Sequence, residues 1–192
     1  MTLRIIFLFL VTPVILFSQN LDGTNRVNSV VDSSDSNNMV LIQSFEVNVS
    51  LDSVWNAYTT EEGWENWAAA KAEIDFKLDG QIKTIYNKQG KIGDESTITL
   101  HIINYVPKKM LTLQAELSSN FPKFILEDEK NLYNMILFDE LNPQKTLVTS
   151  YGIGYRHNDK YLSLMDFFIK GNEQSSLNLI KYLETGKKSI NY

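Results

Sequence analysis

The hydrophobic period of this sequence changes from two residues to three or four near residue 158, and that change constrains the fold most. Before it, short segments with alternating apolar residues follow one another between turn signals. After it, helical segments over residues 158–170 and 172–184 share an apolar stripe, which comprises Leu162, Met165, Phe168, Ile169, Leu177, Ile180 and Leu183. Strands followed by a long helix indicate an α+β fold, in which the helix covers the apolar face of a twisted antiparallel sheet.

The strand region divides into a first strand and a later run. The first strand is expected over residues 40–49, and about six antiparallel strands lie between residues 74 and 155. Asp79 and Gly80 give a strong hairpin signal within the run. Residues 118–130 predict a partly buried loop or a short edge strand. Gly171 is expected to kink or break the terminal helix, and Gly186 to end it.

Two short helices are expected between the first strand and the run. Ser50 is placed as the N-cap of the first, because apolar residues recur after it at helical spacing. Thr60 is followed by two glutamates and is placed as the N-cap of the second, which carries Trp64 and Trp67.

The composition excludes several classes of function. The chain has 192 residues and a net charge of −5, so it lacks the basic surface that nucleic-acid binding requires. Hydrophobic residues make up 43%, which is enough for the core of one domain. Cysteine is absent, so disulfides and thiolate sites are impossible, and the two histidines show no metal-ligand spacing. We therefore expect no metal, no cofactor and no nucleic-acid partner.

The N-terminus has the pattern of a secretory signal peptide over residues 1–18. Arg4 is followed by an apolar run to Phe17, which is too short to span a bilayer of about 30 Å as a helix. An uncleaved anchor is the alternative. Residues 19–38 are rich in Asn, Ser and Asp and predict a disordered linker, so the folded domain is placed at residues 39–188. This organisation predicts an exported, periplasmic or secreted protein with no stable membrane anchor after cleavage.

Four segments together resemble a known family. Residues 54–63 read VWNAYTTEEG and are followed by Trp67, residues 72–80 read AEIDFKLDG, residues 106–111 read VPKKML, and residues 171–175 read GNEQS. In order and spacing they resemble the family named for activators of the heat-shock protein 90 ATPase, within the START-like (SRPBCC) superfamily. The family usually has Gly where Asp79 stands and Trp where Asn172 stands. The similarity spans residues 39–185.

This resemblance implies a helix-grip fold, with a twisted antiparallel sheet wrapped around the terminal helix and a cavity between them. It implies no mechanism, because the superfamily includes lipid carriers, cyclases, dehydratases and co-chaperone modules.

Eight residues are candidates for lining such a cavity. Trp64 and Trp67 either form its mouth or plug one end as core. Ser150 and Gly152 share one strand face, where small side chains leave room for the helix or for a ligand. Tyr86 supplies a polar handle or is an ordinary strand tyrosine. The complete set is Trp64, Trp67, Phe76, Tyr86, Leu113, Ser150, Gly152 and Phe168.

Three functions remain open at this point. The first is an exported, non-catalytic binding protein for a hydrophobic or amphipathic small molecule or lipid. The second is an enzyme of the cyclase or dehydratase type, which requires an ionisable group inside the cavity. The third is a co-chaperone-like interaction module, against which the export signal argues.

Overall fold

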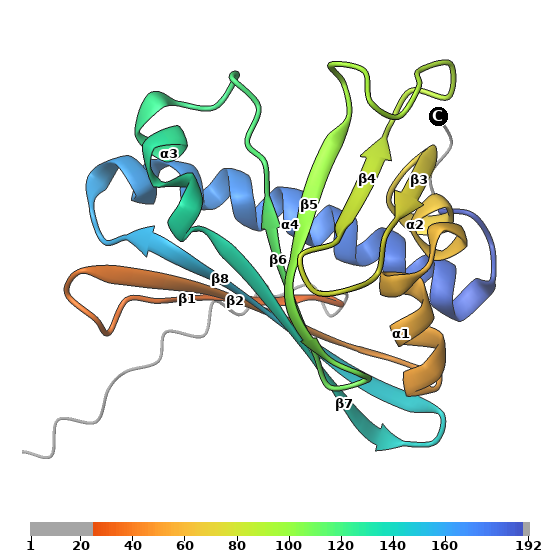
Figure 1. Cartoon of the computed structure of the whole chain (residues 1–192). Coiled ribbons are helices and arrows are strands. Elements are labelled where there is room, and N and C mark those ends of the chain that lie inside the picture. The colour runs from red at the N-terminus through yellow and green to blue at the C-terminus, as the bar shows by residue number, and fades with distance from the viewer. Residues whose placement is uncertain (1–24, 190–192) are drawn as a thin grey trace, which may run out of the picture.

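An eight-stranded antiparallel sheet and one long helix form the framework of the protein (Figure 1). The structure is a computed structural model and describes residues 25–189; the proposed signal peptide lies outside them. The strands are β1 (Asn28–Asp32), β2 (Asn38–Val47), β3 (Lys71–Ile74), β4 (Gln81–Ile85), β5 (Ile98–Val106), β6 (Met110–Ala115), β7 (Tyr133–Asn142) and β8 (Lys145–Arg156). Their order in the sheet is β1-β2-β8-β7-β6-β5-β4-β3.

The helices are α1 (Leu51–Thr59), α2 (Glu61–Trp67), α3 (Lys123–Asp128) and α4 (Asp159–Thr185), with a 3-10 helix at Glu129–Asn131. Figure 1 shows α4 running across the sheet from α3 to the side where α1 and α2 lie. The order of the elements confirms the predicted helix-grip fold.

The local helix signals are confirmed with two exceptions. Ser50 and Thr60 cap α1 and α2, since their hydroxyls accept hydrogen bonds from the backbone N–H groups of Ser53 and Gly63 at 3.3 and 3.0 Å. Gly171 neither ends nor divides α4, because a single glycine costs a helix only about 1 kcal/mol. Residues 118–130 contain α3 rather than an edge strand.

Strand β1 lies in the segment predicted to be a disordered linker. It pairs with the edge of β2, and Val27 beside it is only 1% exposed. The prediction is therefore wrong for residues 25–38, and the domain begins before Met39. The polar residues that suggested disorder form the turn of this hairpin, where Asp32 and Asp35 accept backbone hydrogen bonds.

The core divides into two clusters along α4. The larger lies beneath α1 and α2 and includes Trp64, Trp67, Phe138, Leu179 and Ile180. The smaller lies near α3 and consists of Met39, Ile125, Tyr161 and Met165. The buried side chains of α4 therefore lie toward its two ends.

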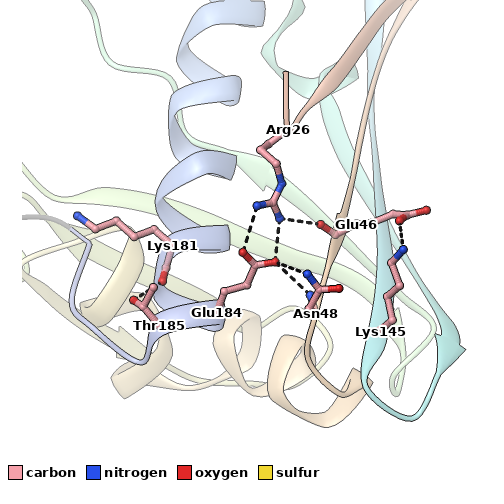
Figure 2. Close-up of polar contacts among 7 residues, drawn as sticks. All are labelled: Arg26, Glu46, Asn48, Lys145, Lys181, Glu184 and Thr185. Carbon is pink, nitrogen blue, oxygen red and sulfur yellow. Dashed lines mark hydrogen bonds and ion pairs between the residues drawn. The ribbon is translucent and has the colours of Figure 1, made fainter. Parts of the chain in front are cut away.

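The C-terminal end of α4 is tied to the N-terminal hairpin by Glu184 (Figure 2). Its two carboxylate oxygens accept hydrogen bonds from the Arg26 guanidinium at 2.8 and 3.1 Å. One of these oxygens also accepts from the backbone and side-chain amides of Asn48, at 3.2 and 3.1 Å. Arg26 donates further to the carbonyl of Glu46 at 3.3 Å, so this carboxylate joins α4 to the residues just before β1 and just after β2.

Replacing Glu184 by Gln tests this tie through its pH dependence. The Arg26 hydrogen bond, followed by those of Asn48, holds the pKa of Glu184 below its ordinary value of 4.5. The stabilisation is therefore present above pH 4.5 and is lost as the pH falls through the folded-state pKa. We expect Glu184→Gln to lower the free energy of unfolding by roughly 0.5–1 kcal/mol at pH 7 and by less near pH 3, measured by urea denaturation.

Asp166→Asn is the matched control, because Asp166 pairs with Lys170 one turn further along the exposed side of α4. A Glu184→Gln effect that does not change between the two pH values would contradict the assignment.

Candidate functional site

A cavity of about 350 Å³ lies between the middle of α4 and the inner face of the sheet. It lies between the two core clusters, and residues of both contribute to its wall. Its described lining consists of Gln43, Phe45, Tyr58, Trp64, Trp67, Leu100, Leu113, Ala115, Leu117, Phe121, Ile125, Leu132, Tyr133, Asn134, Ile136, Ser150, Tyr155, Phe168, Asn172, Ser175 and Ser176.

The cavity coincides with an interruption in the apolar stripe of α4. Going along α4, buried or half-buried apolar residues occur up to Ile169 and begin again at Leu179. Between them the positions are taken by Asn172, Ser175 and Ser176. Phe168 and Ser176 are eight residues apart, so the cavity extends for about 12 Å along the helix.

None of the described lining residues carries a charge. Aromatic rings and aliphatic side chains supply most of the wall, and the polar groups are amides and hydroxyls. Both indole N–H groups are already bonded to backbone carbonyls, Trp64 to Tyr58 at 2.8 Å and Trp67 to Ala57 at 2.9 Å. The tryptophans therefore present ring surface rather than donors to the cavity.

Five of the eight predicted residues lie on this cavity: Trp64, Trp67, Leu113, Ser150 and Phe168. Trp64 and Trp67 are buried and pack on each other with ring centroids 5.0 Å apart, so they are both core and cavity wall. Leu113 and Ser150 come from the sheet and Phe168 from α4.

Phe76 and Tyr86 do not line the cavity. Strand β3 ends at Ile74, so Phe76 belongs to the connection between β3 and β4, where it packs against Trp55 and Tyr105 at centroid distances of 5.8 and 4.7 Å. Tyr86 follows the last residue of β4 and is 53% exposed. Both predictions assumed that regular alternation continues beyond the strand ends.

Gly152 lies beneath a tyrosine ring rather than beside open space. A Cβ atom at this position would meet Cε2 and the hydroxyl oxygen of Tyr155 at 2.9 and 3.0 Å. The register shifts between Met39 and Leu41, and Gly154 has φ +94°, which marks a bulge in β8. The extra residue brings Tyr155 onto the same face as Gly152, so the glycine makes room for the ring.

Gln43 and Tyr155 are two of the cavity residues that the sequence prediction missed. Gln43 is only 3% exposed and lies on β2 between Leu41 and Phe45, on the buried period of that strand. A polar residue within that apolar alternation is the signal that could have identified it. Tyr155 could not be found in this way, because the bulge changes which face it occupies.

The α3 end of the cavity is held by Asp128. This buried carboxylate accepts hydrogen bonds from two guanidinium nitrogens of Arg156, with the Nε bond at 2.6 Å, and from the Tyr161 hydroxyl at 3.0 Å. The Arg156 bonds are the main cause that holds the pKa of Asp128 below its ordinary value. Asp128 thus joins α3 to the end of β8 and to α4, which positions Ile125 in the cavity wall.

The hydroxyls of Tyr58 and Tyr155, which line the cavity, remain protonated at neutral pH. Burial raises the pKa of Tyr155 to about 12 and raises that of Tyr58 further. Among residues 25–189, no three His, Asp or Glu side chains gather closely enough to hold a metal ion. No helix in that part of the chain has the length and apolarity needed to cross a membrane.

Solved structures with the same fold include proteins of three bacteria. A conserved protein of unknown function from Enterococcus faecalis has a TM-score of 0.59 and 13% identity, covering 85% of this chain and 82% of its own. The Aha1 dimer from Colwellia psychrerythraea has a TM-score of 0.57 and 16% identity, covering 77% and 98%. CalU16 from Micromonospora echinospora has a TM-score of 0.54 and 15% identity, covering 82% and 81%. At such identities the similarity shows the fold alone.

Comparison by sequence, rather than by structure, gives one match. No curated protein matches the chain significantly. Residues 48–184 match the sequence profile of the family described as Activator of Hsp90 ATPase homolog 1-like protein, which spans α1 to the end of α4. With that match and the shared fold, this chain belongs to the Activator of Hsp90 ATPase homolog 1-like protein family of the START-like superfamily.

Proposed function

We propose that this chain is a binding protein that holds a neutral, mostly apolar small molecule between α4 and the sheet. The observation that carries the proposal is the wholly uncharged, aromatic-rich lining of the described cavity. Its volume of about 350 Å³ falls in the range of roughly 300–1,000 Å³ that is typical of small-molecule sites. A neutral lipid belongs to the same class of ligand.

The charge of the ligand follows from the chemistry of the wall. An ionised group transferred from water into an apolar cavity loses its hydration and requires an opposite charge or several hydrogen bonds in return. Among residues 25–189, those that line the cavity include no carboxylate, imidazole, amine or guanidinium to provide the opposite charge. A fatty acid or a phospholipid head group is therefore a poorer ligand than a neutral molecule.

The same wall favours binding over catalysis of the cyclase or dehydratase type. General acid–base catalysis is most effective when the catalytic pKa lies near the working pH. The titratable groups of the described lining are tyrosines, and burial raises the pKa of Tyr155 to about 12.

We also propose that the protein acts outside the cytoplasm. The proposal rests on Arg4 and the apolar run of residues 5–17. It argues against a co-chaperone role, which requires a cytosolic ATPase partner. Intact-mass measurement of the protein from a periplasmic or secreted fraction is expected to show a chain that begins near Gln19. A full-length chain retained in the cytoplasm would refute export and leave ligand binding unaffected.

A bulky side chain on α4 tests the binding site directly. Ser176 is half-buried and lines the cavity, so Ser176→Trp is expected to fill the space that a ligand needs. Prodan, a neutral fluorophore whose emission shifts to the blue in apolar surroundings, serves as the probe. We expect its Kd to rise at least roughly tenfold in Ser176→Trp, measured by fluorescence titration.

Gln174→Trp is the matched control, because Gln174 is exposed and lies outside the cavity lining. If circular dichroism shows that Ser176→Trp does not fold, Ala115→Phe fills the cavity from the sheet instead. Prodan that does not bind the wild-type protein, or that binds it and a folded cavity-filling variant equally well, would refute the proposed function.

A further inference from the structure

The amide of Gln43 is held in one orientation by a chain of hydrogen bonds. Its Nε2 group donates to the Ser29 hydroxyl at 2.9 Å and to the carbonyl of Ile169 at 3.3 Å. Ser29 in turn donates its only hydroxyl hydrogen to Glu173 at 2.7 Å. The Ile169 carbonyl and the Ser29 oxygen can therefore only accept from Gln43, so the amide nitrogen, and not the amide oxygen, must face them.

The acceptor of Gln43 is consequently left for the cavity. Both amide hydrogens are used, and within residues 25–189 no group donates to Oε1. Gln43 is 3% exposed and lines the cavity. In the described chain, every side-chain oxygen that is completely inaccessible has a hydrogen-bond partner, so an oxygen without a partner must be accessible. The Oε1 atom is therefore reachable from the cavity, where a donor would satisfy it.

Other uncharged polar groups lie around this acceptor. Ser150 is the direct cross-strand partner of Gln43, and its hydroxyl donates to Asn134 at 2.6 Å. The Tyr155 hydroxyl lies over Gly152, two residues further along β8. From the opposite wall, α4 contributes Asn172, which lies one turn from the Ile169 carbonyl that Gln43 contacts. Together they form a polar zone. Gln43 lies on β2 between Met39 of the smaller core cluster and Phe45 of the larger one, so this polar zone lies between the two ends of the cavity.

The two ends of the cavity differ from this zone. The α2 end presents the rings of Trp64 and Trp67, whose N–H groups are already bonded. The α3 end presents apolar side chains, which are Leu117, Phe121, Ile125 and Leu132. Apolar ring and hydrocarbon surface thus lies on both sides of the polar zone.

We infer that the molecule bound here carries an uncharged hydrogen-bond donor near the middle of its length, which Gln43 Oε1 accepts, with an apolar group on either side. The inference rests on the proposed function and names the chemistry of its ligand. A secondary alcohol flanked by rings or hydrocarbon belongs to this class. A fatty acid, with its polar group at one end and a negative charge, does not.

Two isomeric probes test the position of the donor. Benzhydrol carries its hydroxyl between two phenyl rings, and para-benzylphenol carries it at one end; both are neutral at pH 7. We expect benzhydrol to displace prodan from the wild-type protein with a Kd about three- to tenfold lower than that of para-benzylphenol. Gln43→Leu removes the acceptor and is expected to abolish this preference.

Two further variants complete the experiment. Gln174→Leu makes the same substitution on the exposed side of α4 and is expected to keep the preference. If Gln43→Leu does not fold, Ser29→Ala takes its place, because it removes the acceptor that orients the Gln43 amide, and it is expected to reduce the preference.

The outcomes separate the two proposals. Diphenylmethane has no hydroxyl, so its binding tests the apolar cavity without any hydrogen bond to Gln43. If it and prodan bind but the two isomers bind equally, or keep their preference in Gln43→Leu, the inference is overturned and the proposed function stands. A preference for para-benzylphenol would place the donor at one end, for example beside Tyr58, and would also overturn it. If no probe binds, both proposals fail.

Discussion

Helix α4 covers a curved sheet without filling the space beneath its own middle, and the rest of the structure depends on that mismatch. The helix meets β2, α1 and α2, and its buried side chains fall into the two separate core clusters. A dry void of this volume would cost about 8 kcal/mol by the relation found for engineered cavities, which is a large share of a domain's stability. Polar groups at the middle lower that cost, because they let water or a ligand hydroxyl enter.

Carboxylates hold both ends of α4, in addition to the hydrogen bonds that Gln43 and Ser29 make with its middle. Glu184 ties the C-terminal end to Arg26 and Asn48, and Tyr161 ties the N-terminal end to Asp128. Both ties use carboxylates paired with arginine, whereas none of the described residues that line the cavity carries a charge. The paired charges therefore lie outside the described lining of the cavity.

Local signals explain what the sequence could predict. The caps at Ser50 and Thr60, the strand alternation and the length of the terminal helix depend on neighbouring residues and are confirmed. Strand β1 depends on pairing with β2, so its polar composition was misleading. The placement of Gly152 and Tyr155 depends on a bulge, which no alternation pattern contains. Gln43 could have been recognised, because it is the polar residue within the buried alternation of β2.

The location of a bound apolar molecule tests the central claim most directly. Nuclear Overhauser effects between diphenylmethane and labelled methyl groups report which face of the sheet the molecule contacts. The account predicts contacts with Leu113, Ile125 and Ile136, which line the cavity. Contacts restricted to Ile42 and Leu137, on the opposite face of the sheet, would contradict it.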